Sequence, residues 1–424
     1  MKRLPSVTVD ITPLRESRDF RLVMAGGFLT GLGAQAGLVA LPYQVFVITR
    51  SPVLVGLLGA VELGPLIAAS LLGGALADRI DRRVLLLGVQ AVLVLVAGAL
   101  AAGALAGSPP VWLLYLLAGA SAGASGVERV VRSAIVPNVV SRERLRPALA
   151  FSFGIYQLTM VVGPAVGGVL IASLGLASAY LFDAATCTAM VAAAAAMSAQ
   201  VPVASEQPAR VLASIADGLR FVRGQPALIG SFAIDLLAMT FGMPRALFPV
   251  LSLTVYHAGA TGTGVLYAAV SAGATVAALT TRWLERVGRL GRVVIVAVVV
   301  WGLAIAGAGL TTDIVAACLL FGLAGAADSV SAVCRSTMAQ LITPDRMRGR
   351  VSSVFSLVVA SGPRLGDVEA GGVASLTSTR FSVTSGGLAC VVGVGAIMLA
   401  FPALAAYDGS SDRAPAPAPE PAGA

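Results

Sequence analysis

Residues 73–83 read GGALADRIDRR, a cluster of charge between two long apolar stretches. Residues 53–77 lead into the cluster and residues 84–106 follow it, and both stretches are almost free of charged side chains. About twenty consecutive apolar residues are long enough to cross the hydrocarbon core of a bilayer as a helix. The cluster therefore predicts a tight turn at a membrane face, with one spanning helix on each side.

The whole chain has the composition of a membrane protein. Of its 424 residues, 57% are hydrophobic and 12% are charged, and the mean hydropathy is +0.89, whereas soluble domains carry about 25% charged residues. The net charge of +8 does not indicate nucleic-acid binding, because the arginines fall between apolar spans and Lys2 is the one lysine. We expect the lipid bilayer as a partner, no nucleic acid, and a monomer.

Apolar runs separated by charge clusters predict an all-α integral membrane protein with twelve transmembrane helices in two six-helix lobes. Residues 1–20 are expected to form a cytoplasmic tail, 21–200 the N-terminal lobe, 201–225 a linker with an amphipathic helix, 226–406 the C-terminal lobe and 407–424 a disordered tail. The predicted spans are 21–48, 52–77, 84–106, 110–135, 147–173, 178–200, 226–255, 262–284, 292–311, 314–341, 350–375 and 381–406.

Arginine placement predicts the orientation of these spans. The connections on one side carry arginine clusters such as Arg142, Arg144 and Arg146, whereas those on the other side carry only Arg50 and Arg380. Positive charge near the ends of spans stays in the cytoplasm. Both termini are therefore expected in the cytoplasm of a multi-pass protein of the cell membrane.

The two halves also repeat each other. LADRIDRR at 76–83 is echoed by WLERVGRL at 283–290, and RSAIVPNVVSRERLR at 132–146 by RSTMAQLITPDRMRG at 335–349. Both echoes have an offset of about two hundred residues, which favours two similar six-helix lobes.

The charged turn resembles the loop between helices 2 and 3 of the major facilitator superfamily, with Asp81 in place of the usual glycine. The matching residues are Gly74, Asp78, Arg79, Arg82 and Arg83. The resemblance implies a secondary transporter, with this turn as a cytoplasmic gate. Asp78 would sit against the positive N-terminus of the eleventh span and hold that side shut. The alternative is that the turn only anchors the topology.

A second motif lies in the fifth span, where GPAVGG at 163–168 resembles the end of the superfamily's antiporter motif without its upstream glycines. The matching residues are Gly163, Pro164, Gly167 and Gly168. Pro164 removes a helix hydrogen bond, and the glycines allow close packing. The resemblance implies export; the alternative is a packing kink that does not set direction.

Ionisable side chains inside spans are costly and usually functional. The candidates for proton coupling or the substrate cavity are Glu62, Asp235, Arg245, Asp328, Arg364, Asp367 and Glu369. Arg364 and Asp367 are i,i+3 neighbours and are expected to pair, which leaves Glu369 to exchange protons. The alternative is structural ion pairing. Further charged residues are expected near the membrane faces, either as bystanders (Asp183, Asp313) or as gate salt bridges (Glu128, Arg129, Arg132, Arg335).

The sequences VRSAIVPNVVSRERL and GPRLGDVEAG look most like the enterobactin-exporter branch of the superfamily. This resemblance implies a proton-coupled exporter, or antiporter, of a small organic molecule such as a siderophore, a drug or a natural product. A proton-coupled importer of a metabolite is the alternative within transport. A transport-dead scaffold and a membrane-embedded enzyme remain as weaker alternatives.

No catalytic or metal-binding pattern favours the enzyme. The spans hold no H-E-x-x-H and no Ser/His/Asp set, and His257 is the single histidine. The four cysteines stand singly in apolar stretches without a C-x-x-C pair (Cys187, Cys318, Cys334, Cys390). We therefore expect no cofactor, no metal and no enzymatic activity.

Overall fold

A computed structural model describes residues 11–201, 211–280, 283–284 and 287–409. The parts of the predicted tails at 1–10 and 410–424, linker residues 202–210, and Glu285 and Arg286 of the second repeat lie outside the described residues. The described residues are almost entirely helical and contain no strand, which confirms the fold class.

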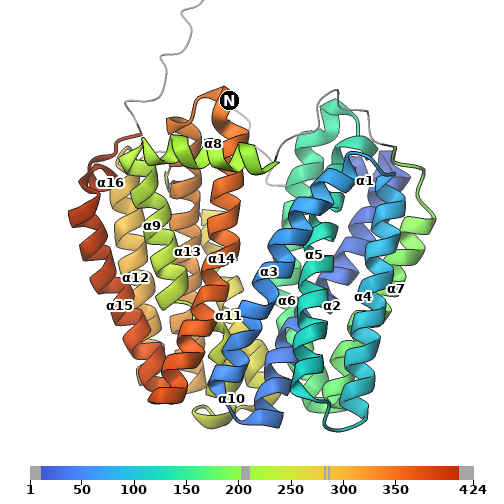
Figure 1. The fold of residues 1–424 in the computed structure, drawn as a ribbon, viewed down its shortest axis with the longest axis horizontal. Helices are drawn as coiled ribbons and strands as arrows, with labels where there is room; N and C mark the ends of the chain where they lie inside the picture. Colours follow the sequence, from blue (N-terminus) through green and yellow to red (C-terminus); the bar gives the residue numbers. More distant parts are fainter. Residues whose placement is uncertain (1–10, 202–210, 281–282, 285–286, 410–424) are drawn as a thin grey trace, which may run out of the picture.

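Two helical bundles stand side by side (Figure 1). The N-terminal lobe contains α1 (Thr12–Glu16), α2 (Arg18–Thr49), α3 (Pro52–Ala77), α4 (Arg82–Leu105), α5 (Val111–Val139), α6 (Leu145–Leu174) and α7 (Leu176–Ala195). The amphipathic α8 (Val211–Arg223) lies within the predicted linker, residues 201–225. The C-terminal lobe contains α9 (Pro226–Phe241), α10 (Phe248–Thr254), α11 (Gly259–Thr280), α12 (Leu290–Leu310), α13 (Ile314–Ile342), α14 (Arg348–Leu376), α15 (Thr379–Ala400) and α16 (Pro402–Ala406).

Eleven described helical segments are long and apolar enough to cross a membrane. The remaining long helix is α14, whose 29 residues carry Arg364, Asp367 and Glu369. Together these twelve segments match the predicted spans, with shifted ends. The first span already begins at Arg18, because the Ser17 hydroxyl accepts a hydrogen bond from the Phe20 N–H at 3.1 Å and caps the helix.

The seventh span is broken in the middle. Helix α9 ends at Phe241, and α10 begins only at Phe248, after the short 3₁₀ turn Arg245–Leu247. Pro244 lacks a backbone N–H and cannot continue α9. The break leaves backbone groups near Arg245 free to bond side chains.

The lobes have the same internal packing. Helix α3 packs on α5 as α11 packs on α13, α4 on α7 as α12 on α15, and α2 on α6 as α9 on α14. Each pair is matched by its counterpart about two hundred residues later, so the structure shows the duplication that the sequence repeats predict.

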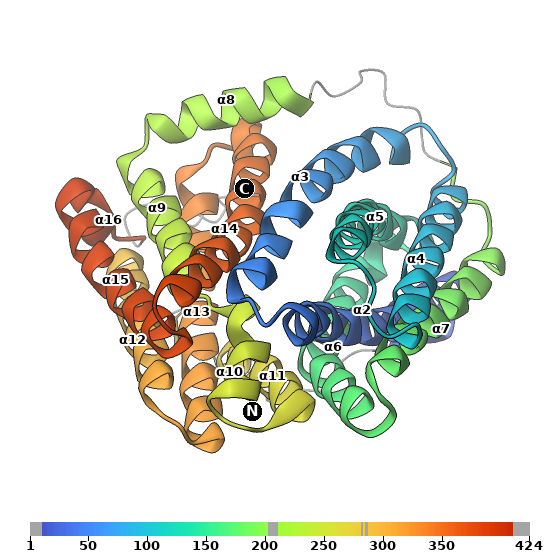
Figure 2. The same cartoon turned by 60° about the horizontal axis from the view of Figure 1, so that its bottom comes forward.

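We call the "arginine-rich face" the side where α3 joins α4, α5 joins α6, α11 joins α12 and α13 joins α14. It is the upper side of Figure 1, where α1 and α8 lie. The lobes contact each other through α3 with α14 and α6 with α11. Toward the arginine-rich face, α3 and α14 diverge (Figures 1 and 2).

Candidate transport site between the lobes

Glycines lie at both of the main contacts between the lobes, α3 with α14 and α6 with α11. Gly56 of α3 meets Gly371 of α14, and a Cβ added to Gly371 would lie 3.0 Å from the Gly56 Cα. Gly168 of α6 meets Gly264 of α11, and a Cβ on Gly264 would lie 2.9 Å from the Gly168 Cα. Small residues let helices approach to backbone contact. The two crossings lie in the half of the molecule away from the arginine-rich face.

The antiporter-like motif forms one of these crossings. Added Cβ atoms at Gly163 and Gly167 would meet Gln35 and Ala36 of α2, and Gly168 faces Gly264 of the other lobe. The motif therefore packs α6 against its own lobe and against the other lobe. Pro164 belongs to the same contact, because its carbonyl oxygen lies against Gly264.

A group of charged side chains lies beside the other crossing. Arg364 of α14 pairs with Glu62 of α3, with Nη2 and Oε2 3.6 Å apart. Both side chains are partly buried, 22% and 29% exposed. This ion pair joins the two lobes, because α3 belongs to the first and α14 to the second.

Asp367 does not pair with Arg364 as predicted. Its Oδ1 accepts a hydrogen bond of 3.0 Å from the Ala246 N–H, a donor that is free because the seventh span breaks there. The Arg364 Nη1 instead donates to the Ala360 carbonyl oxygen at 3.2 Å. The hydroxyl of Tyr267 on α11 donates to the Arg245 carbonyl oxygen at 2.9 Å, which fixes the same break from the other side.

Glu369 lies outside this group. It follows Leu365 by four residues and precedes Leu376 by seven, so the three share one side of α14. Leu365 is 43% exposed and Leu376 is 87% exposed. The opposite side of α14, which carries Asp367 and Gly371, packs on α3. The structure therefore places Glu369 away from the lobe contact.

Asp235 and Asp328 belong to a different cluster inside the C-terminal lobe. Arg335 of α13 pairs with Asp235 of α9 at 2.8 Å, and both side chains are at most 3% exposed. Arg335 also lies 3.6 Å from Asp328 and donates to the Ser331 hydroxyl at 3.1 Å. Arg335 was expected in a gate salt bridge, and this was wrong because its partner is a buried acid of its own lobe.

The N-terminal lobe holds two partly buried acids of its own. Glu128 pairs with Arg132 at 3.3 Å, four residues along α5. Asp183 of α7, expected near the outer surface, lies against α2, where a Cβ on Gly33 would meet its carboxylate at 2.8 Å. The glycines of α2 could have indicated this position for Asp183 from the sequence, because they leave room for a side chain from a neighbouring helix.

The gate motif bonds within its own lobe. Arg82 donates to the Ala134 carbonyl oxygen at 3.0 Å, and Arg83 donates to the Ala194 carbonyl oxygen at 3.1 Å. Asp81, the departure from the superfamily pattern, caps α4 through the Arg83 N–H at 2.8 Å. Gly74 faces open space. Arg79 is exposed.

The predicted latch is not formed in this structure. Asp78 is exposed, and its carboxylate has no partner among the residues that the structure describes. At the start of α14, Arg350 pairs instead with Asp217 of α8 at 3.1 Å. Gly218 of α8 packs directly on the Arg350 backbone. Asp78 and the start of α14 are apart because α3 and α14 diverge toward this face.

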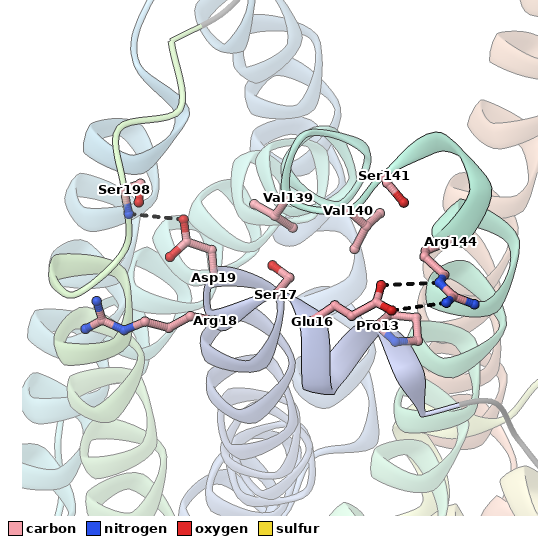
Figure 3. Close-up of a pocket in the computed structure, with 10 residues that line it drawn as sticks. All are labelled: Pro13, Glu16, Ser17, Arg18, Asp19, Val139, Val140, Ser141, Arg144 and Ser198. Atoms are coloured by element: carbon pink, nitrogen blue, oxygen red, sulfur yellow. Dashed lines mark hydrogen bonds and ion pairs between the residues drawn. The ribbon is translucent and has the colours of Figure 1, made fainter.

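A cavity of about 440 Å³ also lies at the arginine-rich face, lined by residues of α1, the start of α2 and the end of α5 (Figure 3). Glu16 accepts two hydrogen bonds from Arg144, at 3.1 and 3.2 Å, and Asp19 accepts one from the Ser198 N–H at 3.2 Å. These contacts tie α1 and the start of α2 to the 3₁₀ turn Arg142–Arg144 before α6 and to the segment that follows α7. The cavity lies within one lobe, apart from the charged group at the lobe contact.

Comparisons with known proteins agree with this architecture. A family model described as transmembrane secretion effector matches residues 8–422. The enterobactin exporters EntS of Shigella boydii serotype 4 and of Citrobacter koseri are each 28% identical over 393 residues, which cover 92% of this chain and 93% of each relative.

Solved structures show the same fold at low sequence identity. The nucleoside transporter NupG is 15% identical, with a TM-score of 0.71 over 91% of this chain and 99% of that one. A bacterial homolog of the human lysosomal transporter Spinster is 16% identical, with a TM-score of 0.71 over 95% of this chain and 99% of that one. With the match along nearly its whole length, the chain belongs to the transmembrane secretion effector family of the major facilitator superfamily, and it is a multi-pass membrane transporter of small molecules, not an enzyme.

Proposed function

We propose that this protein exports a small organic molecule, such as a siderophore, a drug or a natural product, by proton-coupled antiport. The observation that carries the proposal is the full-length similarity to proteins named as enterobactin exporters. The GPAVGG motif supports it, because Gly168 lies at a contact between the lobes. A monomer would suffice, because one chain supplies both lobes.

The arrangement of the lobes supports alternating access. They meet at two glycine crossings and diverge toward the arginine-rich face. If both termini are cytoplasmic, as the arginine distribution predicts, this structure is the inward-facing state. Rocking the lobes would close that face, bring Asp78 toward the start of α14, and open the opposite side of the membrane.

The inter-lobe ion pair supports a route for proton coupling. When the lobes move apart at α3 and α14, Glu62 would lose its contact with Arg364. A charged group left unpaired in a low-dielectric site is unfavourable, and proton binding would neutralise the carboxylate. We therefore propose Glu62 as the leading coupling residue, with Asp235, Asp328, Asp367 and Glu369 as the other candidates.

Transport in inside-out membrane vesicles tests the proposal. An exporter accumulates enterobactin, the compound in its relatives' name, inside such vesicles when the proton gradient is acidic inside. A broad-spectrum dye tested in parallel separates a siderophore exporter from a drug exporter. Accumulation only in right-side-out vesicles would support the importer instead. Absence of flux for either compound in both orientations would contradict export of these two substrate types.

A further inference from the structure

Three arginines from both lobes lie around the charged crossing. Arg364 stands on α14, Arg245 in the break of the seventh span, and Arg129 on α5. Arg364 pairs with Glu62 at 3.6 Å, and Asp367 accepts a hydrogen bond from the N–H of Ala246, the residue that follows Arg245. This region therefore holds three arginines and two acids, one basic side chain more than acidic ones.

Arg129 is oriented toward the second lobe. It follows Gly126, which packs on α3, by three residues, and it precedes Arg132, which lies against the Gly27 carbonyl oxygen of α2, by three residues. Arg129 therefore lies between the sides of α5 that face α3 and α2, the helices that border the C-terminal lobe. Its side chain is exposed.

The rise of the helices gives the depth of Arg364 and of Arg129 below the arginine-rich face. At 1.5 Å per residue, Arg364 lies about 24 Å along α14 from the arginine-rich face, and Arg129 about 15 Å along α5 from the same face. Arg129 is thus roughly 9 Å closer to the face toward which the lobes diverge. Arg129 therefore lies between that face and the depth of Arg364.

Most of the hydrogen-bond donors of these three arginines have no partner among the residues that the structure describes. Within the described part of the chain, the guanidinium groups of Arg129 and Arg245 have no hydrogen-bond or ion-pair partner, and the buried Arg364 Nε has none. Each guanidinium presents five N–H donors in a planar fork that matches a carboxylate. Unpaired positive charge at membrane depth is unfavourable unless an anion neutralises it.

We propose that Arg129, Arg245 and Arg364 bind the anionic group of the transported molecule, so that the substrate is an organic anion. Arg129 would meet the anion first, and Arg245 and Arg364 would hold it where the two lobes touch. The inference rests on the proposed transport function for its physiological meaning, but binding itself requires no flux. The site can therefore be tested even if export fails.

The test measures binding of salicylate and of salicylamide to the full-length protein in nanodiscs made only of phosphatidylcholine. The two probes share a ring and differ by one carboxylate, and the lipid offers no net anionic headgroup to compete. Saturation-transfer NMR, with empty nanodiscs subtracted, gives the two affinities. We expect salicylate to bind at least about tenfold more tightly, because a hydrogen bond to a charged group is stronger than one to a neutral group.

Substitutions of the arginines test whether they form the binding site for the carboxylate. Arg129→Gln and Arg245→Gln should each weaken salicylate binding about tenfold and leave salicylamide binding unchanged, and Arg129→Lys should retain most of the affinity. Arg142→Gln is the control, since it removes an equal charge from the exposed connection between α5 and α6. Equal affinities for acid and amide, or unchanged salicylate binding in both glutamine variants, would overturn the proposal whether or not the protein exports anything.

Discussion

Replacing Asp235 by asparagine should destabilise the protein strongly through its partner Arg335. The two side chains form an ion pair of 2.8 Å and are at most 3% exposed. Removing one member of a buried pair typically costs about 3–5 kcal/mol, because the other charge stays buried without compensation. Asp328 remains 3.6 Å from Arg335 and is 31% exposed, so we expect the lower end, about 3 kcal/mol.

Asp328→Asn is the matched control. It removes the same charge from the same arginine at a longer distance and a more exposed position, so we expect a loss of at most about 1 kcal/mol. Asp235→Leu combined with Arg335→Met should recover much of the stability, because it removes both buried charges. Denaturant unfolding in detergent, followed by tryptophan fluorescence, measures all three variants; of the three tryptophans, Trp301 is buried and should respond most to unfolding, whereas Trp112 and Trp283 are exposed.

The comparison separates a structural pair from a coupling site. If Asp235→Asn is no less stable than Asp328→Asn, the reasoning from burial is refuted. If the Asp235→Asn variant is also inserted normally and exports without dependence on the proton gradient, Asp235 is a coupling residue and replaces Glu62 as the leading candidate.

Three further predictions concern orientation, gate and coupling. In a cysteine-free background, single cysteines at Gly107 and Ser141 should be labelled from outside and inside the cell respectively; labelling from the same side would contradict the topology. Asp78→Asn should insert normally but slow transport severalfold, because it removes charge from the latch; wild-type flux would leave the turn as a topology anchor. Glu62→Gln should remove the dependence of export on the proton gradient and Glu369→Gln should preserve it, as vesicle flux at two internal pH values would show; the reverse result would return the coupling role to Glu369.

The architecture could be read from the sequence because hydropathy and charge report directly on the bilayer. The twelve segments, the duplication and the amphipathic linker helix all follow from patterns along the chain. The break in the seventh span was also visible, since Gly242 and Pro244 stand in the middle of an apolar run. The ends of helices were less predictable, because caps such as Ser17 add residues that hydropathy does not detect.

The partners of the charged residues could not be read in the same way. Neighbours along one helix suggested that Arg364 would pair with Asp367, yet the partner of Arg364 comes from α3 in the other lobe. That contact depends on how closely Gly56 and Gly371 let two distant helices approach. Spacing within one segment also could not show that Glu369 lies on the side of α14 away from the lobe contact.

The backbone contact at the two glycine crossings has an energetic consequence for switching between states. Side chains that interlock across a seam must leave their packed positions when the seam opens, and each loses many dispersion contacts. Gly56, Gly371, Gly168 and Gly264 have no side chains to disengage, so separating them exposes little apolar area. The two lobes can therefore part with a small barrier at these points, and the Glu62–Arg364 ion pair is the charged contact between α3 and α14 that must open with them.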